Sequence, residues 1–219
     1  MHTYLVTGAN RGIGLELCRQ LVERGDEVFA ACRATSPELE ALDVTVFEGV
    51  DVGDDDSMNK FSLEVDGMDM DVIINNAGVL YSDNLDSIDM DQVRSQVEIN
   101  TMGPLRVATL LRENLDSGGK FVIVSSLMGS MSDNGSGGHY GYRLSKAGAN
   151  AVGVSLARDL AAKEISVGIF HPGMVATAMT GGRGISVEES VKGLLERIGE
   201  LNLENSGTFL HQNGESLGW

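Results

Sequence analysis

The sequence has few cysteines and no long hydrophobic run. Its two cysteines, Cys18 and Cys32, lie in an expected helix and an expected strand. We therefore interpret them as reduced core thiols and not as a disulfide framework. No stretch reaches the roughly 18 apolar residues that a membrane-spanning helix needs, and the first residues lack the basic and apolar regions of a signal peptide. We expect a cytoplasmic protein with no membrane partner.

Positive charge is also scarce. The chain has 32 acidic and 16 basic residues, which give a formal net charge of −16. Such a balance argues against a nucleic-acid partner or an anionic membrane surface. Only 5 of the 16 basic residues are lysine, so adaptation to a high-salt cytoplasm is a second interpretation of the acidic surface. The four histidines show no metal-ligand spacing, and we expect no metal site.

Short apolar runs alternate with helix-like segments along the whole chain. The runs predict strands at 3–8, 27–33, 44–52, 70–78, 120–126, 165–173 and 207–211. Helical periodicity predicts helices at 12–25, 92–115, 142–162 and 187–200, the second of them bent near residues 100–104. Short apolar strands that alternate with helices form parallel sheets covered on both faces. We therefore predict an α/β fold in which residues 1–219 form a single doubly wound, Rossmann-like domain around a seven-stranded parallel sheet.

A glycine-rich turn joins the first expected strand to the first helix. In "TGANRGIG" (7–14), the glycines are Gly8, Gly12 and Gly14. Their spacing is a variant of the dinucleotide-binding fingerprint, but the physical requirement is the same. The backbone must turn tightly and approach a pyrophosphate whose charge lies at the helix N-terminus. This placement predicts dinucleotide binding.

The end of the second expected strand indicates which dinucleotide binds. NAD enzymes usually carry an acidic residue there, which holds the ribose hydroxyls. This sequence reads "AACRATS" (30–36) and offers Arg33 in place of an acid. An arginine can pair with a 2′-phosphate that an acid would repel, and Arg11 in the glycine turn could add a second cation. We favour NADP(H) over NAD(H), although both arginines could also be solvated surface residues.

Two tyrosines precede a lysine in "HYGYRLSKAG" (139–148). Tyr142 and Lys146 are four residues apart and would share one face of a helix, whereas Tyr140 would point elsewhere. A cation beside a phenol lowers the pKa of the phenol from its usual value of about 10. Tyr142 is therefore the better candidate for an acid–base group, although such a pair also arises by chance in many helices.

Six motifs together resemble the short-chain dehydrogenase/reductase family. They are "TGANRGIG" (7–14), "NNAG" (75–78), Asn100 in "EINTMGP", "VSS" (124–126), "YRLSK" (142–146) and "HPGMVAT" (171–177), in the order that the family shows. Within the family, the segment from Ser125 to Asn150 and the last residues, "FLHQNGESLGW", are similar to the C-factor and Sniffer-like carbonyl reductases. The resemblance covers nearly the whole chain.

The resemblance implies a role for each matching residue. Tyr142 would be the acid–base, Lys146 would lower the pKa of the phenol and bind the nicotinamide ribose, and Ser126 would hold the substrate carbonyl. Asn100 would bend its helix and help to place a water. The implied cofactor site comprises Tyr142 and Lys146 together with Gly8, Asn10, Arg11, Gly12, Ile13, Gly14, Arg33, Asp51, Val52, Asn76, Ala77, Gly78, Pro172, Gly173, Val175 and Thr177.

The serine assignment has an alternative. Ser126 precedes Tyr142 by 16 residues, a longer spacing than is common in the family. The Gly/Ser/Asn-rich segment "SDNGSGG" (132–138) can absorb the extra length as a loop. Ser125 is the alternative, and because side chains alternate along a strand only one of the two serines can face the site.

The expected function is an NADPH-dependent oxidoreductase that interconverts a small-molecule carbonyl and an alcohol. A cofactor-bound signalling or sensor protein of the C-factor type, with incidental turnover, is the alternative. The segment 145–162 is small and apolar nearly all round, so it is expected to be buried on more than one side. The resemblance implies a two-fold homodimer through helices around 100–115 and 142–162.

Overall fold

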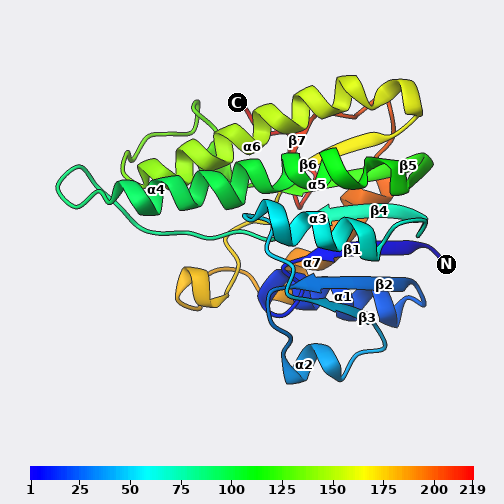
Figure 1. Ribbon diagram of the computed structural model, residues 1–219. Coiled ribbons are helices and arrows are strands. Elements are labelled where there is room, and N and C mark those ends of the chain that lie inside the picture. The colour runs from blue at the N-terminus through cyan, green and yellow to red at the C-terminus, as the bar shows by residue number, and fades with distance from the viewer.

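All seven strands run parallel in one sheet. The computed structural model describes residues 1–219, and its strand order is β3-β2-β1-β4-β5-β6-β7 (Figure 1). The predicted α/β fold with a seven-stranded, doubly wound parallel sheet is therefore confirmed. The strands are β1 Thr3–Thr7, β2 Glu27–Cys32, β3 Thr45–Glu48, β4 Met70–Asn75, β5 Leu115–Val124, β6 Ser166–His171 and β7 Phe209–His211.

The strand order reverses between β1 and β4. The chain first builds outward through β2 and β3, then crosses over to pair β4 with the other side of β1, with Tyr4 opposite Val72. The connections that leave β1 and β4 therefore diverge to opposite faces of the sheet. In such sheets, this point leaves a crevice outside the carboxyl ends of the strands, where ligands bind.

Helices cover both faces of the sheet, and each face has its own core. On one face, α1 (Gly12–Glu23), α2 (Pro37–Glu40) and α7 (Val187–Glu200) pack on residues such as Phe170. On the other, α3 (Asp55–Glu64), α5 (Gly103–Leu111) and α6 (Tyr140–Asp159) pack on residues such as Phe121. The period of two along each strand sends successive apolar residues to opposite cores.

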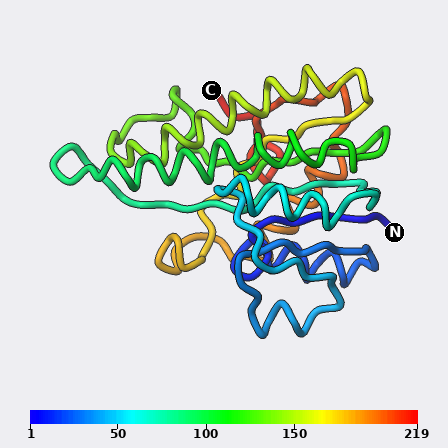
Figure 2. Tube along the Cα trace, viewed as in Figure 1, coloured from blue at the N-terminus to red at the C-terminus, as the bar shows by residue number.

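A long helical rod crosses the second face, and it contains the predicted bend. The rod consists of α4 (Met90–Val97), a π-helical turn (Glu98–Met102) and α5, which follow one another in line (Figure 2). Arg106 attaches the rod to the segment after β3 by donating to the carbonyl of Val52 at 2.6 Å, and it donates to Glu98 Oε1 within the rod at 2.6 Å. The expected irregularity near residues 100–104 is thus a π turn, a feature that often marks functional sites.

Two helices were absent from the sequence prediction. Helix α2 is a single turn that begins with Pro37, and the Ser36 hydroxyl accepts a hydrogen bond from Leu39 N. Helix α3 is capped by Asp54, which accepts from Ser57 N at 2.7 Å. A Ser-Pro pair and an Asp run are ordinary helix-start signals, but both helices are short and neither has a strong apolar period. No helix has both the length and the apolar character needed to span a lipid bilayer.

Candidate active site

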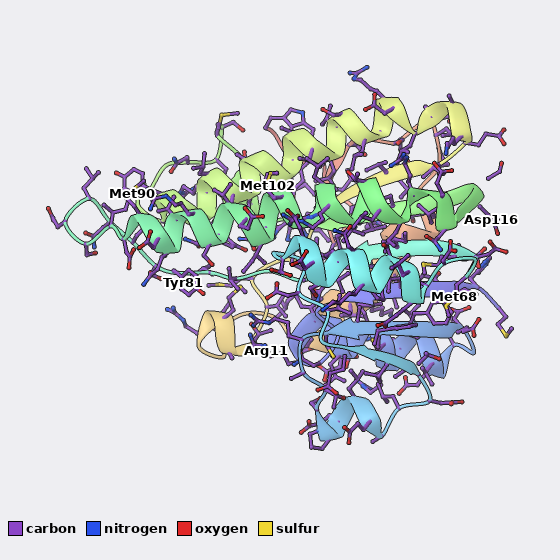
Figure 3. All side chains as sticks on the ribbon, viewed as in Figure 1. Arg11, Met68, Tyr81, Met90, Met102 and Asp116 are labelled. Carbon is purple, nitrogen blue, oxygen red and sulfur yellow. The ribbon has the colours of Figure 1, made fainter.

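The predicted site residues gather at the carboxyl edge of the sheet. The glycine turn follows β1, "NNAG" continues from β4, Ser126 follows β5, and "HPGMVAT" begins in β6. Because the four strands are neighbours in the sheet, segments that are far apart in the sequence meet along one edge. In Figure 3, Arg11 of the glycine turn and Tyr81 beyond β4 both lie toward this edge.

The glycine turn is packed directly against the segment that follows β4. A Cβ atom on Gly8, which has a φ of +66°, would lie 2.8 Å from Ala77 Cα, and one on Gly14 would lie 2.2 Å from Gly8 O. Asn76 Nδ2 donates to the carbonyls of Thr7 and Gly8 at 3.0 and 3.2 Å. Only glycine fits at these two positions, so the turn is held rigidly close to β4.

The N-terminus of α1 is available to an anion. Its N-cap residue, Arg11, makes no side-chain capping bond, and its first turn contains no acidic residue. Helix α7, in contrast, is capped by Ser186 and carries Glu188 and Glu189 in its first turn. The free N–H groups and the positive end of the α1 dipole suit a pyrophosphate, as the sequence predicted.

The region beyond β2 suits a second phosphate. The Arg33 side chain is 63% exposed, its ion-pair partner Asp51 lies 3.9 Å away, and the Glu48 carboxylate accepts from Thr35 N at 3.4 Å. Thr35 Oγ1 is buried without a hydrogen-bond partner. The Asn10 amide donates to Ala34 O at 2.8 Å and so fixes the main chain between Arg33 and Thr35. A weakly paired guanidinium beside an unpartnered hydroxyl fits a phosphate monoester.

Tyr142 and Lys146 lie in the first two turns of α6 and are almost completely buried. Their exposed fractions are 7% and 6%. Lys146 Nζ lies 5.8 Å from the centroid of the Tyr142 ring and donates to Val124 O at 2.9 Å. The predicted shared face is thus present. Tyr140 is the first residue of α6 and is 41% exposed, in contrast to this buried pair.

The two consecutive serines face different surroundings. The Ser125 hydroxyl donates to Asn150 Oδ1 inside the protein. Ser126 lies on the Tyr142 side, where its hydroxyl is near enough to lower the pKa of the phenol, and it accepts from Met128 N at 3.2 Å. The longer spacing in the sequence therefore places Ser126, not Ser125, beside Tyr142.

Burial dominates the electrostatics of the Tyr142–Lys146 pair. Burial raises the pKa of the Tyr142 phenol to about 12, and the Ser126 hydroxyl offsets only part of this rise. Burial also lowers the pKa of the Lys146 ammonium to about 8. The resemblance implied that Lys146 would lower the pKa of the phenol, but in the structure burial sets the direction of the shift, and Ser126 is the group that opposes it. Tyr142 is consequently a protonated phenol at neutral pH.

Asn100 connects the π turn to the segment beyond "NNAG". Its Oδ1 accepts from Val79 N at 2.9 Å, while Nδ2 donates to Val79 O and to Ser145 Oγ. A Cβ atom on Gly78 would lie 3.1 Å from Asn100 Oδ1 and 3.7 Å from Lys146 Nζ. Both N–H groups of the Asn100 amide therefore bind protein atoms, and Oδ1 accepts one hydrogen bond beside Lys146.

The segment after β6 completes the edge. Pro172 O accepts from Ser190 Oγ at 2.7 Å, which ties the segment to α7, and Gly173 has a φ of +86°. Val175 pairs with Ile185, and Thr177 Cγ2 would lie 3.6 Å from a Cβ atom on Gly12. Of the four predicted residues in this segment, Thr177 therefore lies beside the glycine turn.

Several polar residues in this region had no role in the sequence prediction. Gln96, Ser145 and Asn150 are buried within α4 and α6, and Asp83 contacts the start of α6. The His171 and His211 rings lie 5.0 Å apart, and burial together with His211 and Lys146 lowers the pKa of His171 to about 4. Gln96, Ser145 and Asn150 are polar residues within predicted helices, and this was a weak signal that they have a role. No local sequence pattern indicated a role for Asp83.

The buried ammonium of Lys146 generates a prediction about stability. Its pKa falls from 10.5 to about 8 on folding, so the unfolded chain binds more protons between these values and the native protein gains stability as pH rises through them. Lys146→Met removes the free-energy cost of burying the charged ammonium, which corresponds to about 3 kcal/mol. The loss of the hydrogen bond to Val124 offsets part of this gain in stability. We expect Lys146→Met to be more stable than the wild type by about 1–3 kcal/mol at pH 7, and the difference to vanish toward pH 10.5.

Urea unfolding at pH 7, 8, 9.5 and 10.5 measures this difference. Lys60→Met is the matched control, because Lys60 is exposed on α3 and its replacement should produce no pH-dependent change. A Lys146→Met protein that is less stable than the wild type by the same amount at every pH would contradict the prediction.

Comparisons with known proteins agree with this geometry. The family model of the short chain dehydrogenases matches residues 2–186. The chain is 43% identical over 226 residues to 1-hydroxy-2-glutathionyl-2-methyl-3-butene dehydrogenase of Rhodococcus sp. (strain AD45), with 100% of both chains covered. It is 36% identical over 167 residues to C-signal of Myxococcus xanthus, covering 74% of this chain and 100% of that protein.

Solved structures give the same result. Carbonyl reductase Sniffer of D. melanogaster superposes with a TM-score of 0.90 at 27% identity, covering 100% of both chains. The NADPH-bound carbonyl reductase from chicken fatty liver superposes with a TM-score of 0.87 at 27% identity, covering 100% of this chain and 99% of that one. The resemblance that the six motifs indicated is thus confirmed, and the chain belongs to the short-chain dehydrogenase family of oxidoreductases.

Proposed function

We propose that this protein is an NADP(H)-dependent reductase that interconverts a small-molecule carbonyl and an alcohol. The observation that carries the proposal is the convergence of Ser126, Tyr142 and Lys146 beside "NNAG", the segment that packs on the glycine turn at the start of α1. The carbonyl reductases among the similar structures support the reaction class. The name of the Rhodococcus relative describes dehydrogenation of a hydroxy compound, which is the same reaction class in the opposite direction.

The roles of the side chains follow from their positions and protonation states. A bound nicotinamide supplies or accepts the hydride. Ser126 and Tyr142 donate hydrogen bonds to the substrate oxygen, and Tyr142 gives its proton to that oxygen as negative charge develops there. Because the pKa of Tyr142 is raised to about 12, the phenol carries this proton throughout the neutral range. The positive charge of Lys146 stabilises the phenolate that remains.

Removal of the Tyr142 hydroxyl tests the proposed role of this residue as the proton donor. We expect Tyr142→Phe to lower turnover by roughly 10²–10³-fold or more and to retain NADPH binding, because the glycine turn and Arg33 are unchanged. The assay follows loss of nicotinamide absorbance with quinones, dicarbonyls and aldehydes, and in the oxidative direction with a glutathionyl alcohol. Tyr140→Phe is the matched control and should keep the wild-type rate.

The same assay separates the enzyme from the sensor alternative. Similarity to C-signal makes a signalling role a specific competitor. Tight NADPH binding by the wild-type chain without turnover of any compound would favour the sensor interpretation. Turnover that Tyr142→Phe leaves intact would show that another group is the acid–base.

Preference for NADP(H) rests on the region beyond β2. Arg33 is weakly paired and exposed, Thr35 Oγ1 is unpartnered, and no acidic residue occupies the end of the strand. Arg33 would pair with the 2′-phosphate, and the Thr35 hydroxyl would donate to it. Asp51 lies near enough to orient the guanidinium, but at 3.9 Å it does not saturate it.

Replacement of Arg33 should therefore change cofactor choice. We expect Arg33→Ala to weaken NADPH binding by roughly 10–100-fold, the value of a charge-assisted hydrogen bond, and to leave NADH binding unchanged. Arg94→Ala is the matched control, because the Arg94 side chain is 70% exposed on α4 and distant from the glycine turn. Titration of cofactor fluorescence measures both affinities, and equal losses for NADPH and NADH would contradict the preference.

We also propose a homodimer through the rod and α6. Both present exposed apolar or small residues on their outer sides, with Met102 and Leu105 on the rod and Leu144 and Ala151 on α6. Figure 3 labels Met102 on the rod, where the rod runs beside α6. The two helices cross closely, since a Cβ atom on Gly148 would lie 2.8 Å from Thr101 Cγ2. A second copy related by a two-fold axis would cover both apolar stripes at once.

Charge placed on this surface should separate the subunits. We expect light scattering to give the mass of a dimer for the wild type and of a monomer for Leu105→Glu/Leu144→Glu. Leu63→Glu is the matched control, because Leu63 is 78% exposed on α3, away from the proposed interface. A monomeric wild type would rule out the proposal.

A further inference from the structure

The segment 79–83 lies between the cofactor side of the site and the start of α6. It continues from "NNAG" after β4 and runs beneath α4, where Figure 3 labels Tyr81. It has no regular secondary structure. Val79, Tyr81 and Asp83 are nevertheless held by hydrogen bonds to the neighbouring helices, and each of the three attachments includes a specific side chain.

The first two attachments come from amide side chains of the rod. Asn100 binds both main-chain polar groups of Val79, at 2.9 and 2.8 Å. Four residues earlier, Gln96 Oε1 accepts from Tyr81 N at 2.9 Å, and Gln96 is completely buried. A Cβ atom on Gly141 would lie 2.4 Å from Gln96 Nε2. The Gln96 amide therefore fills the space between segment 79–83 and the first turn of α6.

The third attachment comes from Asp83, and it reaches α6 itself. Asp83 Oδ1 accepts from Tyr140 N at 2.6 Å, and Oδ2 accepts from Gly141 N at 3.0 Å. The main-chain carbonyl of Asp83 accepts from His139 N at 2.9 Å. Thus one residue satisfies three consecutive N–H groups at the start of the helix that carries Tyr142.

Helix α6 has no cap of its own. Its N-cap residue, His139, has a left-handed backbone with a φ of 50° and makes no side-chain capping bond, and the first turn contains no acidic residue. Four other helices are capped by a side chain from the preceding residue: Ser36, Asp54, Asp89 and Ser186. In α6, Asp83 supplies the capping carboxylate, although it lies 57 residues away from Tyr140 in the sequence. It accepts from the free N–H groups and its charge lies at the positive end of the helix dipole.

We propose that Asp83 is a positioning residue for Tyr142, a role that rests on the proposed function. Tyr142 is the third residue of α6, directly after the two residues whose N–H groups Asp83 binds. Asp83 therefore fixes the turn from which the phenol projects. Through Val79 and Asn100, the same segment is attached beside Lys146. The phenol, Lys146 and the segment that follows β4 are thus held together by these contacts.

Loss of the Asp83 carboxylate should disturb the position of the phenol more than ligand binding. We expect Asp83→Ala to lower kcat by roughly 10–100-fold, as a displacement of about 1 Å at a reacting group can do, with KM for NADPH unchanged. Asp83→Asn keeps one acceptor and should restore an intermediate kcat. Hydrogen–deuterium exchange should be faster at the first turn of α6 in Asp83→Ala.

Asp86→Ala is the matched control. It removes the same charge from the same exposed loop, and the Asp86 carboxylate has no contact with α6. We expect this variant to keep the wild-type kcat and exchange. These results, together with the kcat loss in Asp83→Ala and its partial rescue by Asp83→Asn, would support the inference.

Three results would overturn the inference. One is faster exchange in Asp83→Ala with an unchanged kcat, which would make Asp83 a cap without a catalytic consequence. The second is unchanged exchange in Asp83→Ala, and the third is an equal loss of kcat in Asp86→Ala. A wild-type chain that turns over no carbonyl compound would instead overturn the proposed function, and the inference with it, so the two failures are distinguishable.

Discussion

The site depends on a buried ammonium group. Lys146 is placed where water is excluded, and burial alone lowers its pKa to about 8. The group is tolerated because Val124 O accepts a hydrogen bond and the Tyr142 ring lies beside it. Glycine is required at position 129, since a Cβ atom there would lie 2.8 Å from the main-chain carbonyl carbon of Lys146. The same exclusion of water raises the pKa of the phenol, so one constraint sets the protonation of both groups.

The arrangement of the sheet explains why such a site can be assembled at all. Parallel strands present all their carboxyl ends on one edge, and the reversal of strand order between β1 and β4 opens a crevice there. The glycine turn leads into α1, and Tyr142 and Lys146 lie on α6, and these two helices pack on opposite faces of the sheet. They are brought into register by the direct packing of Gly8 on Ala77 and by the hydrogen bonds of Asn76.

Much of this could be predicted from the sequence, because local patterns with a strong period encode it. The seven strands, the glycine turn and the Tyr142–Lys146 face follow from alternation, from glycine spacing and from helical geometry. The short helices α2 and α3 were missed because only capping residues indicate them. The raised pKa of Tyr142 and the contact of Asp83 with α6 depend on tertiary burial and on a pairing across 57 residues, which no local pattern contains.

The π turn in the rod also has a consequence for how this chain can change over generations. A π turn holds one residue more than an α-helical turn, and each residue of an α-helix rotates the direction of the side chains by about 100°. Gln96 lies before the turn and faces inward, whereas Leu105 lies after it and is exposed. Deletion of a single residue between them would rotate one face relative to the other. The direction of the inner and outer faces therefore depends on the number of residues in the rod. Insertions or deletions within the rod are for this reason far less tolerated than substitutions.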